Sequence, residues 1–217
     1  SLAGAEGAEI RLDETENDGD DTAVDGLLAN VTVAATELFA DNSVFGSDGE
    51  AAATATVYGL VLNGGDGVDS GLDDTESGEN VLLYTDGGAI VGRTAVGDEE
   101  VFRISVDSAS GDVTVTQSRA IVNDDPNDPD EANGPESMSG GLVELQVTVT
   151  DGDGDTDTDS IELGSLIKFE DDGPMASLAG AEGAEIRLDE TENEGDDTAV
   201  DGQQANVTVA ATEQIAD

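Results

Sequence analysis

The residues best suited to chemistry are aspartates at alternate positions of one short segment: Asp151, Asp153, Asp155 and Asp157. A turn built this way can direct several carboxylates at one centre, and Ca²⁺ takes about six to eight oxygen ligands. The spacing resembles the start of an EF-hand loop, with Glu162 at the twelfth position. However, Thr156 stands at the sixth position, where that loop needs glycine, and no helical pattern flanks the segment. The pattern predicts a calcium-binding turn between strands; the competing interpretation is a solvated acidic turn that aids solubility.

A second acidic cluster follows the first predicted strand and recurs near the end of the chain. It spans residues 13–21, and its copy spans residues 189–197. The density of acids is sufficient to hold one calcium ion. The candidate ligands are Asp13, Glu14, Glu16 and Asp20, with Asp189 and Glu190 in the copy.

A third cluster, Glu170-Asp171-Asp172-Gly173-Pro174, lies at a seam between repeated sequences. Asp171 and Asp172 are candidate ligands of a cation that stiffens the linker, and the alternative is a plain flexible joint. The strand at 142–150 leads into the Asp151–Asp155 turn, and the strand at 158–169 returns from it. We therefore expect the turn and the seam at opposite ends of the fold, with the N-terminus beside the turn.

A fourth acidic motif is Gly64-Gly65-Asp66-Gly67-Val68-Asp69. It matches the nonapeptide of calcium-binding β-rolls, which functions by stacking in tandem, and the chain holds one copy. Asp66 and Asp69 are therefore better read as candidates for a calcium site in an ordinary loop.

The composition limits what else the chain can do. Its 217 residues include 52 acidic and 6 basic side chains, a formal charge of −46, and no Cys, His or Trp. Disulfides, thiolate zinc sites, imidazole ligands and Ser-His-Asp catalysis are thereby excluded. The charge repels nucleic acid and anionic lipid, and no apolar run suits membrane insertion. We expect no enzymatic activity, because no nucleophile has a base beside it and no carboxylate pair stands out.

A long repeat organises the chain. Residues 1–41 and 177–217 are identical at 36 of 41 positions, an offset of 176 residues. This indicates one complete repeat at 1–176 and the opening of a second, truncated repeat at 177–217, as in a tandem array whose units contact their neighbours.

Three of the five differences replace leucine by glutamine. Gln203, Gln204 and Gln214 stand where the first copy has Leu27, Leu28 and Leu38. We interpret them as an adaptation of a truncated unit that lacks the strands to bury these leucines. Engineering is one origin of such an adaptation, and the alternative interpretation is natural drift between repeats.

The hydrophobic pattern predicts strands and no helix. Alternation with period two marks residues 8–12, 30–39, 54–62, 81–85, 89–94, 101–106, 112–122, 142–150 and 158–169. Residues 108–111 form a predicted hairpin turn with Gly111 in place. Eight or nine short strands at this spacing predict an all-β fold, an antiparallel β-sandwich of the immunoglobulin-like, Greek-key kind.

The segments VFRISVDSASGDVTVTQSRAIV and LVELQVTVTDGDGDTDTDSIELGSLIKFEDDGP resemble the repeat of giant repeats-in-toxin (RTX) adhesins, which bacteria export by type I secretion. The resemblance covers residues 1–176, and its recognisable parts are the VTVTQ strand, the DGDGD turn and the closing FEDDGP. It implies an extracellular, calcium-binding β-sandwich on the bacterial cell surface. Many such units carry a histidine where this chain has Asn123, so any role of that histidine is absent here.

Together these features favour a structural extender repeat of a secreted adhesin, made rigid by Ca²⁺. Its partners would be neighbouring repeats of the same chain, with no nucleic acid and no small-molecule substrate. The alternative is a calcium-dependent module of the same adhesin that binds sugar or ice. That function needs an exposed aromatic residue or a regular threonine array, and the sequence shows neither clearly.

Overall fold

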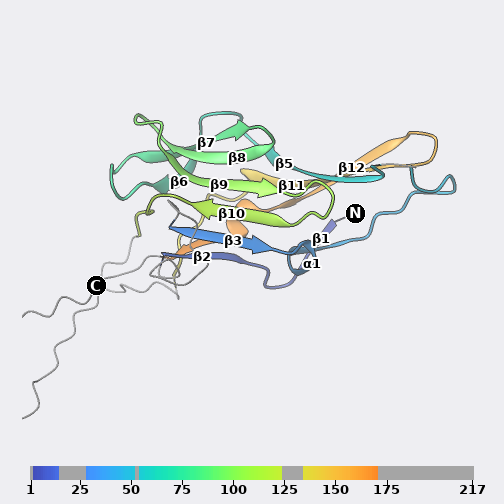
Figure 1. The fold of residues 1–217 in the computed structure, drawn as a ribbon, viewed down its shortest axis with the longest axis horizontal. Helices are drawn as coiled ribbons and strands as arrows, with labels where there is room; N and C mark the ends of the chain where they lie inside the picture. Colours follow the sequence, from blue (N-terminus) through green and yellow to red (C-terminus); the bar gives the residue numbers. More distant parts are fainter. Residues whose placement is uncertain (1, 15–27, 52–53, 124–133, 171–217) are drawn as a thin grey trace, which may run out of the picture. The chain divides into compact units, whose positions relative to one another are not determined.

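The computed structural model describes residues 2–14, 28–51, 54–123 and 134–170. The chain divides into two compact units, Ser1–Pro174 and Met175–Asp217, and all of these residues belong to the first. One layer is a six-stranded sheet with the order β3 (Ala29–Val33), β10 (Val113–Gln117), β9 (Glu100–Val106), β8 (Ala89–Thr94), β7 (Asn80–Asp86) and β6 (Val68–Asp73). The other layer contains β12 (Thr156–Glu162), β11 (Val143–Thr150) and β5 (Thr56–Leu62) (Figure 1).

Two small strand pairs complete the fold. β1 (Leu2–Gly4) lies antiparallel to β4 (Phe39–Asp41), and β2 (Ile10–Asp13) lies parallel to β13 (Ile167–Glu170). All other pairs are antiparallel. Strands β6 to β10 follow one another as a meander, whereas β3 reaches the side of β10 by a long connection, as in a Greek key. The predicted antiparallel β-sandwich is confirmed.

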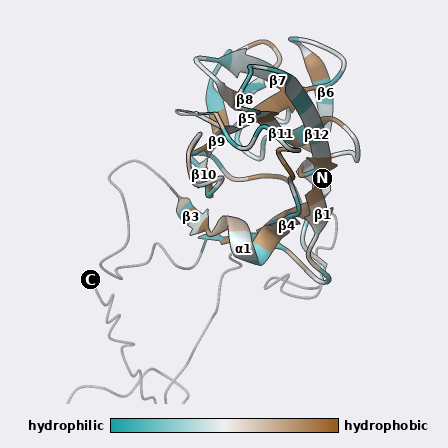
Figure 2. Ribbon diagram, turned by 90° about the vertical axis from the view of Figure 1, so that its right-hand side faces the viewer, coloured by the Kyte–Doolittle hydropathy of each residue, from teal (hydrophilic) through white to brown (hydrophobic). Residues whose placement is uncertain are grey.

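The strands form because their side chains alternate between core and surface. Val113, Val115 and Gln117 of β10 are buried, and the threonines between them are half-buried. The same alternation runs along β11, and brown and teal residues alternate along single strands in Figure 2. The rings of Phe102 and Phe169 meet in the core with centroids 5.2 Å apart. A Cβ on Gly92 would lie 2.5 Å from the Phe102 ring, so this position needs glycine.

Several element boundaries differ from the sequence prediction. The expected strand at 30–39 is broken by α1 (Ala35–Leu38), and the backbone amide of Ala35 donates to an Asp112 carboxylate oxygen at 2.9 Å. The expected strand at 112–122 ends at Gln117, because the next residues cross to Val101 and to the β6–β7 turn. The segment predicted at 158–169 is split by η2 (Gly164–Leu166) into β12 and β13. The hydrophobic pattern does not indicate strand β6, because the glycine-rich motif at its start predicts a loop.

Both predicted hairpins are present. β9 and β10 flank the turn at 108–111, where Gly111 has φ +80°, and β11 and β12 flank the Asp151–Asp155 turn. The N-terminal strand lies close to β12, because the Leu2 amide donates to an Asp159 carboxylate oxygen at 2.8 Å. The β11–β12 turn and the C-terminal end of β2 stand at opposite ends of the sandwich (Figure 1).

Candidate metal site

The β11–β12 hairpin turn lies against the connection between β4 and β5. Glu50 forms an isolated antiparallel bridge with Asp151, and the Ala51 amide donates to the Thr150 carbonyl at 3.1 Å. The Gly152 amide donates to the Gly49 carbonyl at 2.9 Å. These backbone bonds hold two turns together that are about a hundred residues apart in the sequence.

Glycine is required where the two turns touch. A Cβ on Gly152 would lie 2.4 Å from the backbone oxygen of Asp48, a distance at which atoms overlap. The Asp151 carboxylate accepts the Gly154 amide at 3.1 Å and the Asp155 amide at 2.9 Å. The glycines of the predicted DGDGD turn therefore allow its close approach to residues 48–49, and its first aspartate fixes the shape of the turn.

This approach brings together the carboxylates of Asp48, Asp151 and Asp153. One oxygen from each lies within 4.8 Å of the others. Ligands on opposite sides of a calcium ion are separated by up to about 5 Å, since each Ca–O distance is about 2.3–2.6 Å. One ion can therefore touch all three carboxylates. Hard oxygen ligands without nitrogen or sulfur fit Ca²⁺ better than a transition metal.

The carboxylates of Asp151 and Asp153 are close enough to shift each other's pKa. The hydrogen bond shared with Asp151, together with the negative charge of Asp151, raises the pKa of Asp153. Accepting that hydrogen bond and the amides of the turn lowers the pKa of Asp151. In the described part of the chain, no ion pair joins any of the three to a basic side chain. A cation from solution would supply the missing positive charge.

Two other aspartates predicted in this turn lie outside the three-carboxylate cluster. The backbone of Asp155 supports the Asp151 carboxylate, while its own side chain is exposed. Asp157 lies opposite Val149 and lines a shallow pocket with Val44 and Thr156. Asp48, which sequence reasoning missed, takes part instead. Its only local signal is a short Asp-Gly-Glu turn in a chain full of acids.

The cluster predicted at the end of β2 is described in part. Asp13 is half-buried and pairs in register with Glu170, whose carboxylate lies 2.9 Å from the Arg11 guanidinium. Glu14 accepts a hydrogen bond from the Gln117 side-chain amide at 2.7 Å. Gln117 is fully buried, and within the described residues its Oε1 has no hydrogen-bond partner. The side-chain nitrogen of Gln117 faces this carboxylate, and Glu14 stays a candidate ligand from the sequence pattern.

The remaining predicted ligands are hydrogen-bonded elsewhere or not described. Asp66 accepts the backbone amide and the hydroxyl of Thr85, and Asp69 accepts the Gly71 amide and the Asn80 side chain. These bonds close the β6–β7 hairpin and leave the loop calcium site a prediction. The predicted ligands that lie outside the described residues are Glu16, Asp20, Asp171, Asp172, Asp189 and Glu190.

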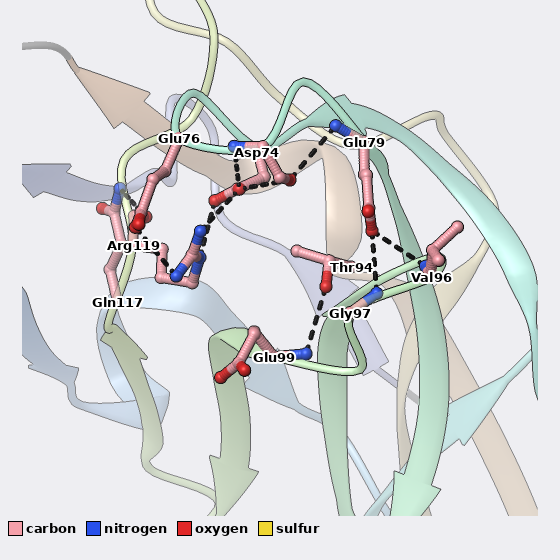
Figure 3. Close-up of polar contacts among 10 residues, drawn as sticks. Asp74, Glu76, Glu79, Thr94, Val96, Gly97, Glu99, Gln117 and Arg119 are labelled. Atoms are coloured by element: carbon pink, nitrogen blue, oxygen red, sulfur yellow. Dashed lines mark hydrogen bonds and ion pairs between the residues drawn. The ribbon is translucent and has the colours of Figure 1, made fainter.

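A second carboxylate cluster, also missed from the sequence, has its positive charge built in (Figure 3). Asp74 is fully buried and accepts two hydrogen bonds from Arg119, both at 2.8 Å. It also accepts the amide and the hydroxyl of Ser77, and Arg119 contacts Glu76 at 2.9 Å. The hydrogen bonds from Arg119, aided by those from Ser77, lower the pKa of Asp74 to about 2. The sequence signal for such a pair is the scarcity of basic residues: with 6 of them among 52 acids, each arginine can be expected to bind a carboxylate. The sequence does not show which carboxylate, because each arginine has many possible partners.

A third carboxylate in the same view, that of Glu79, is stabilised by backbone amides and not by an arginine or a metal. The Glu79 carboxylate accepts the backbone amides of Val96 at 2.8 Å and Gly97 at 3.0 Å, and these bonds lower its pKa (Figure 3). Glu79 thereby ties the β6–β7 turn to the β8–β9 turn.

The fold and the site define an antiparallel β-sandwich domain with an acidic cluster between two of its turns. The chain belongs to the family described as a domain of unknown function (DUF5801), which matches residues 9–164. No curated protein and no solved structure matches the chain. Among the described residues, no helix is long and apolar enough to cross a membrane.

Proposed function

We propose that this domain is a structural extender repeat of a secreted bacterial adhesin, and that Ca²⁺ folds and stiffens it. The observation that carries the proposal is the convergence of Asp48, Asp151 and Asp153. Three carboxylates from two turns lie within reach of one ion, and none of them forms an ion pair with a basic side chain of the described residues. The resemblance to RTX adhesin repeats and the duplication of residues 1–41 support a place in a tandem array.

The mechanism follows from the charge. With scarce calcium, as inside a cell, a net charge of −46 opposes compaction and keeps the chain suitable for export. Outside the cell, calcium binds the folded chain and shifts the equilibrium towards it by mass action. An ion held by Asp48, Asp151 and Asp153 would lock the β4–β5 connection onto the β11–β12 hairpin. The role of such a repeat is spacing and stiffness, with neighbouring repeats as its partners and no catalytic step.

A calcium titration at constant ionic strength tests this function. Thermal unfolding is followed by circular dichroism in chelator and in calcium, with sodium chloride adjusted so that general screening stays fixed. At a free calcium concentration of 100 times the dissociation constant, each site adds about 2.7 kcal/mol of stability. We expect the melting temperature to rise by several degrees or more per site. Equal melting curves in chelator and in calcium would contradict the proposal.

A further inference from the structure

Strand β5 lies at one edge of the three-stranded sheet, and one side of its backbone is open. Its partner on the other side is β11. The amide of Tyr58 points away from β11, because it donates to the Ser108 carbonyl at 3.0 Å. The peptide groups of an antiparallel strand alternate between its two sides, so those of Leu60 and Leu62 point away from β11 as well. Among the described residues, neither leucine has a backbone hydrogen bond on that side.

A groove borders this open side of β5. Its volume is about 440 Å³, and β5 lines it with residues 58–60. The opposite wall consists of the β7–β8 turn, at Gly87 and Gly88, and the end of β9, at Val106. A Cβ added to Gly59, Gly87 or Gly88 would meet no atom within 4 Å. The groove therefore offers free space beside unpaired peptide groups, which is what an added strand requires.

Negative charge is absent from this edge of the sheet. The chain has 52 acidic residues, yet residues 51–65 contain none, and no other stretch without acids is as long. In contrast, β12 at the opposite edge of the same sheet carries Asp157, Asp159 and Glu162. Charged residues on an edge strand discourage pairing with another chain. By this criterion β12 is protected against an added strand and β5 is not.

The charge around the groove indicates the kind of partner. Asp86 and Asp107 are exposed, and each directly precedes a residue that lines the groove, Gly87 and Ser108 respectively. The Asp107 carboxylate accepts backbone amides of its own turn, and among the described residues it forms no ion pair. Two copies of a chain with a charge of −46 repel each other, whereas a basic peptide is attracted. A peptide with an uncharged centre and basic ends therefore fits this edge better than a second copy does.

We propose that the open side of β5 binds an extended peptide of another protein by strand addition. The occupant has uncharged residues that favour a strand, such as valine and threonine, beside Leu60, and basic residues on both sides of them. Its backbone exchanges hydrogen bonds with the peptide groups of Leu60 and Leu62, and the three-stranded sheet gains a fourth strand. The groove contains no member of the three-carboxylate cluster, so this site is a function separate from calcium-dependent spacing.

Amide hydrogen exchange in the full chain, followed residue by residue by nuclear magnetic resonance in calcium, tests the site. The probe is a capped synthetic peptide in which alternating valines and threonines lie between pairs of lysines. At saturating peptide, exchange of the Leu60 and Leu62 amides should slow about tenfold or more, because the added strand accepts their hydrogen bonds. The Thr158 amide, which points outward at the β12 edge, should keep its exchange rate.

Two matched controls separate strand addition from simple attraction of charge. The same peptide, N-methylated throughout its valine and threonine segment, keeps its charge but cannot pair, so it should leave all three exchange rates unchanged. Leu60→Pro removes an outward N–H that β11 does not use, and it should abolish the protection of Leu62 by the peptide. Thr158→Pro makes the same change at the β12 edge and should leave that protection intact. The N-methylated peptide acts on the unaltered protein, so the test stands even if Leu60→Pro does not fold.

Several results would overturn the proposal. Unchanged exchange of Leu60 and Leu62 at the highest soluble peptide concentration would show that the edge takes no added strand. Equal protection by the N-methylated peptide, or protection of Thr158 in place of Leu60, would show attraction of charge alone. Protection of both leucines before any peptide is added would show that the edge is already occupied. Sedimentation would then assign the occupant to a second copy if the protein is a dimer, and to another part of the same chain if it is a monomer.

Discussion

Two carboxylate clusters of this sandwich handle their charge in opposite ways. Asp74 is fully buried and meets the Arg119 guanidinium in a two-pronged pair, so its positive partner is part of the chain. Asp48, Asp151 and Asp153 lie at the surface, with no ion pair to a basic side chain among the described residues. In a chain with 52 acids and 6 basic residues, few carboxylates can have an internal partner. The first cluster has its counter-charge within the chain, whereas the second makes stability depend on the cations that the solution supplies.

Breaking the internal pair should have the largest effect. Arg119→Leu leaves a buried carboxylate without its partner, and loss of one member of a buried pair typically removes about 3–5 kcal/mol of unfolding free energy. Urea unfolding in calcium measures the loss. Arg93→Leu is the matched control, because its partners are partly or largely exposed and their ion pairs are longer, at 3.6 Å. If the two variants unfold at similar urea concentrations, the buried Asp74–Arg119 pair contributes no more to stability than the exposed ion pairs of Arg93.

Removing one candidate calcium ligand should have the next largest effect. Asp48→Asn should abolish most of the gain of about 2.7 kcal/mol per site expected at 100-fold excess over the dissociation constant, while leaving stability in chelator nearly unchanged. Asp155→Asn is the control, because it removes the same charge from the same end of the sandwich outside the three-carboxylate cluster. Loss of the calcium response in both variants, or in neither, contradicts the assignment of Asp48.

Lowering the pH should reduce the stabilisation from the Asp74 cluster and relieve the repulsion within the Asp48, Asp151 and Asp153 cluster. The folded pKa of Asp74 is about 2, below its ordinary value of 3.8, so its contribution is complete above about pH 5 and is lost as the pH falls from about 4 towards 2. The shift corresponds to about 2 kcal/mol. The pKa of Asp153 is raised instead, by the hydrogen bond to Asp151 and by the charge of that neighbour, so Asp153 takes up its proton at a higher pH than an ordinary aspartate and its repulsion with Asp151 is relieved. In chelator, Arg119→Leu should therefore flatten the loss of stability between pH 4 and pH 2; an unchanged slope would assign that loss to other acids.

The smallest effect should come from Glu79, which uses backbone amides in place of a cation. Glu79→Gln keeps an acceptor for the Val96 and Gly97 amides but removes the charge that strengthens both bonds. We expect a slight fall in melting temperature, smaller than for Arg119→Leu and equal in calcium and in chelator. A calcium-dependent difference would show that Glu79 belongs with the metal-responsive acids.

The local features of this fold were predictable from sequence, and its long-range contacts were not. Alternation along 101–106 and 142–150 identifies strands, because a half-buried strand must repeat its apolar residues every second position. The Asp151–Asp155 turn follows from glycines and aspartates between two such strands. Asp48 joins it from about a hundred residues away, and Arg119 meets Asp74 across forty-five. Such pairings depend on which strands become neighbours, and no local spacing or alternation along the chain reveals this.

Long-range contacts also explain why the predicted ends of two strands, at 30–39 and 158–169, were wrong. Residues 30–39 alternate well enough to suggest one strand, but the Asp112 carboxylate binds the Ala35 amide and favours a helical turn there. Ile167 to Glu170 continue an apolar pattern from β12, yet they leave its sheet to pair with β2. In both places a contact from a distant segment changes the direction of a chain whose local pattern would allow it to continue.

The parallel pair of β2 and β13 has a mechanical consequence. Tension along the chain enters β2 at Ile10 and leaves β13 at Glu170, and these residues stand at opposite ends of the ladder that runs from Ile10–Ile167 to Asp13–Glu170. A pull on the repeat therefore slides the two strands past each other and loads their hydrogen bonds together, whereas a hairpin pulled at its open end would peel one bond at a time. Separating β2 from β13 by such a pull therefore requires the hydrogen bonds of their ladder to break together in shear.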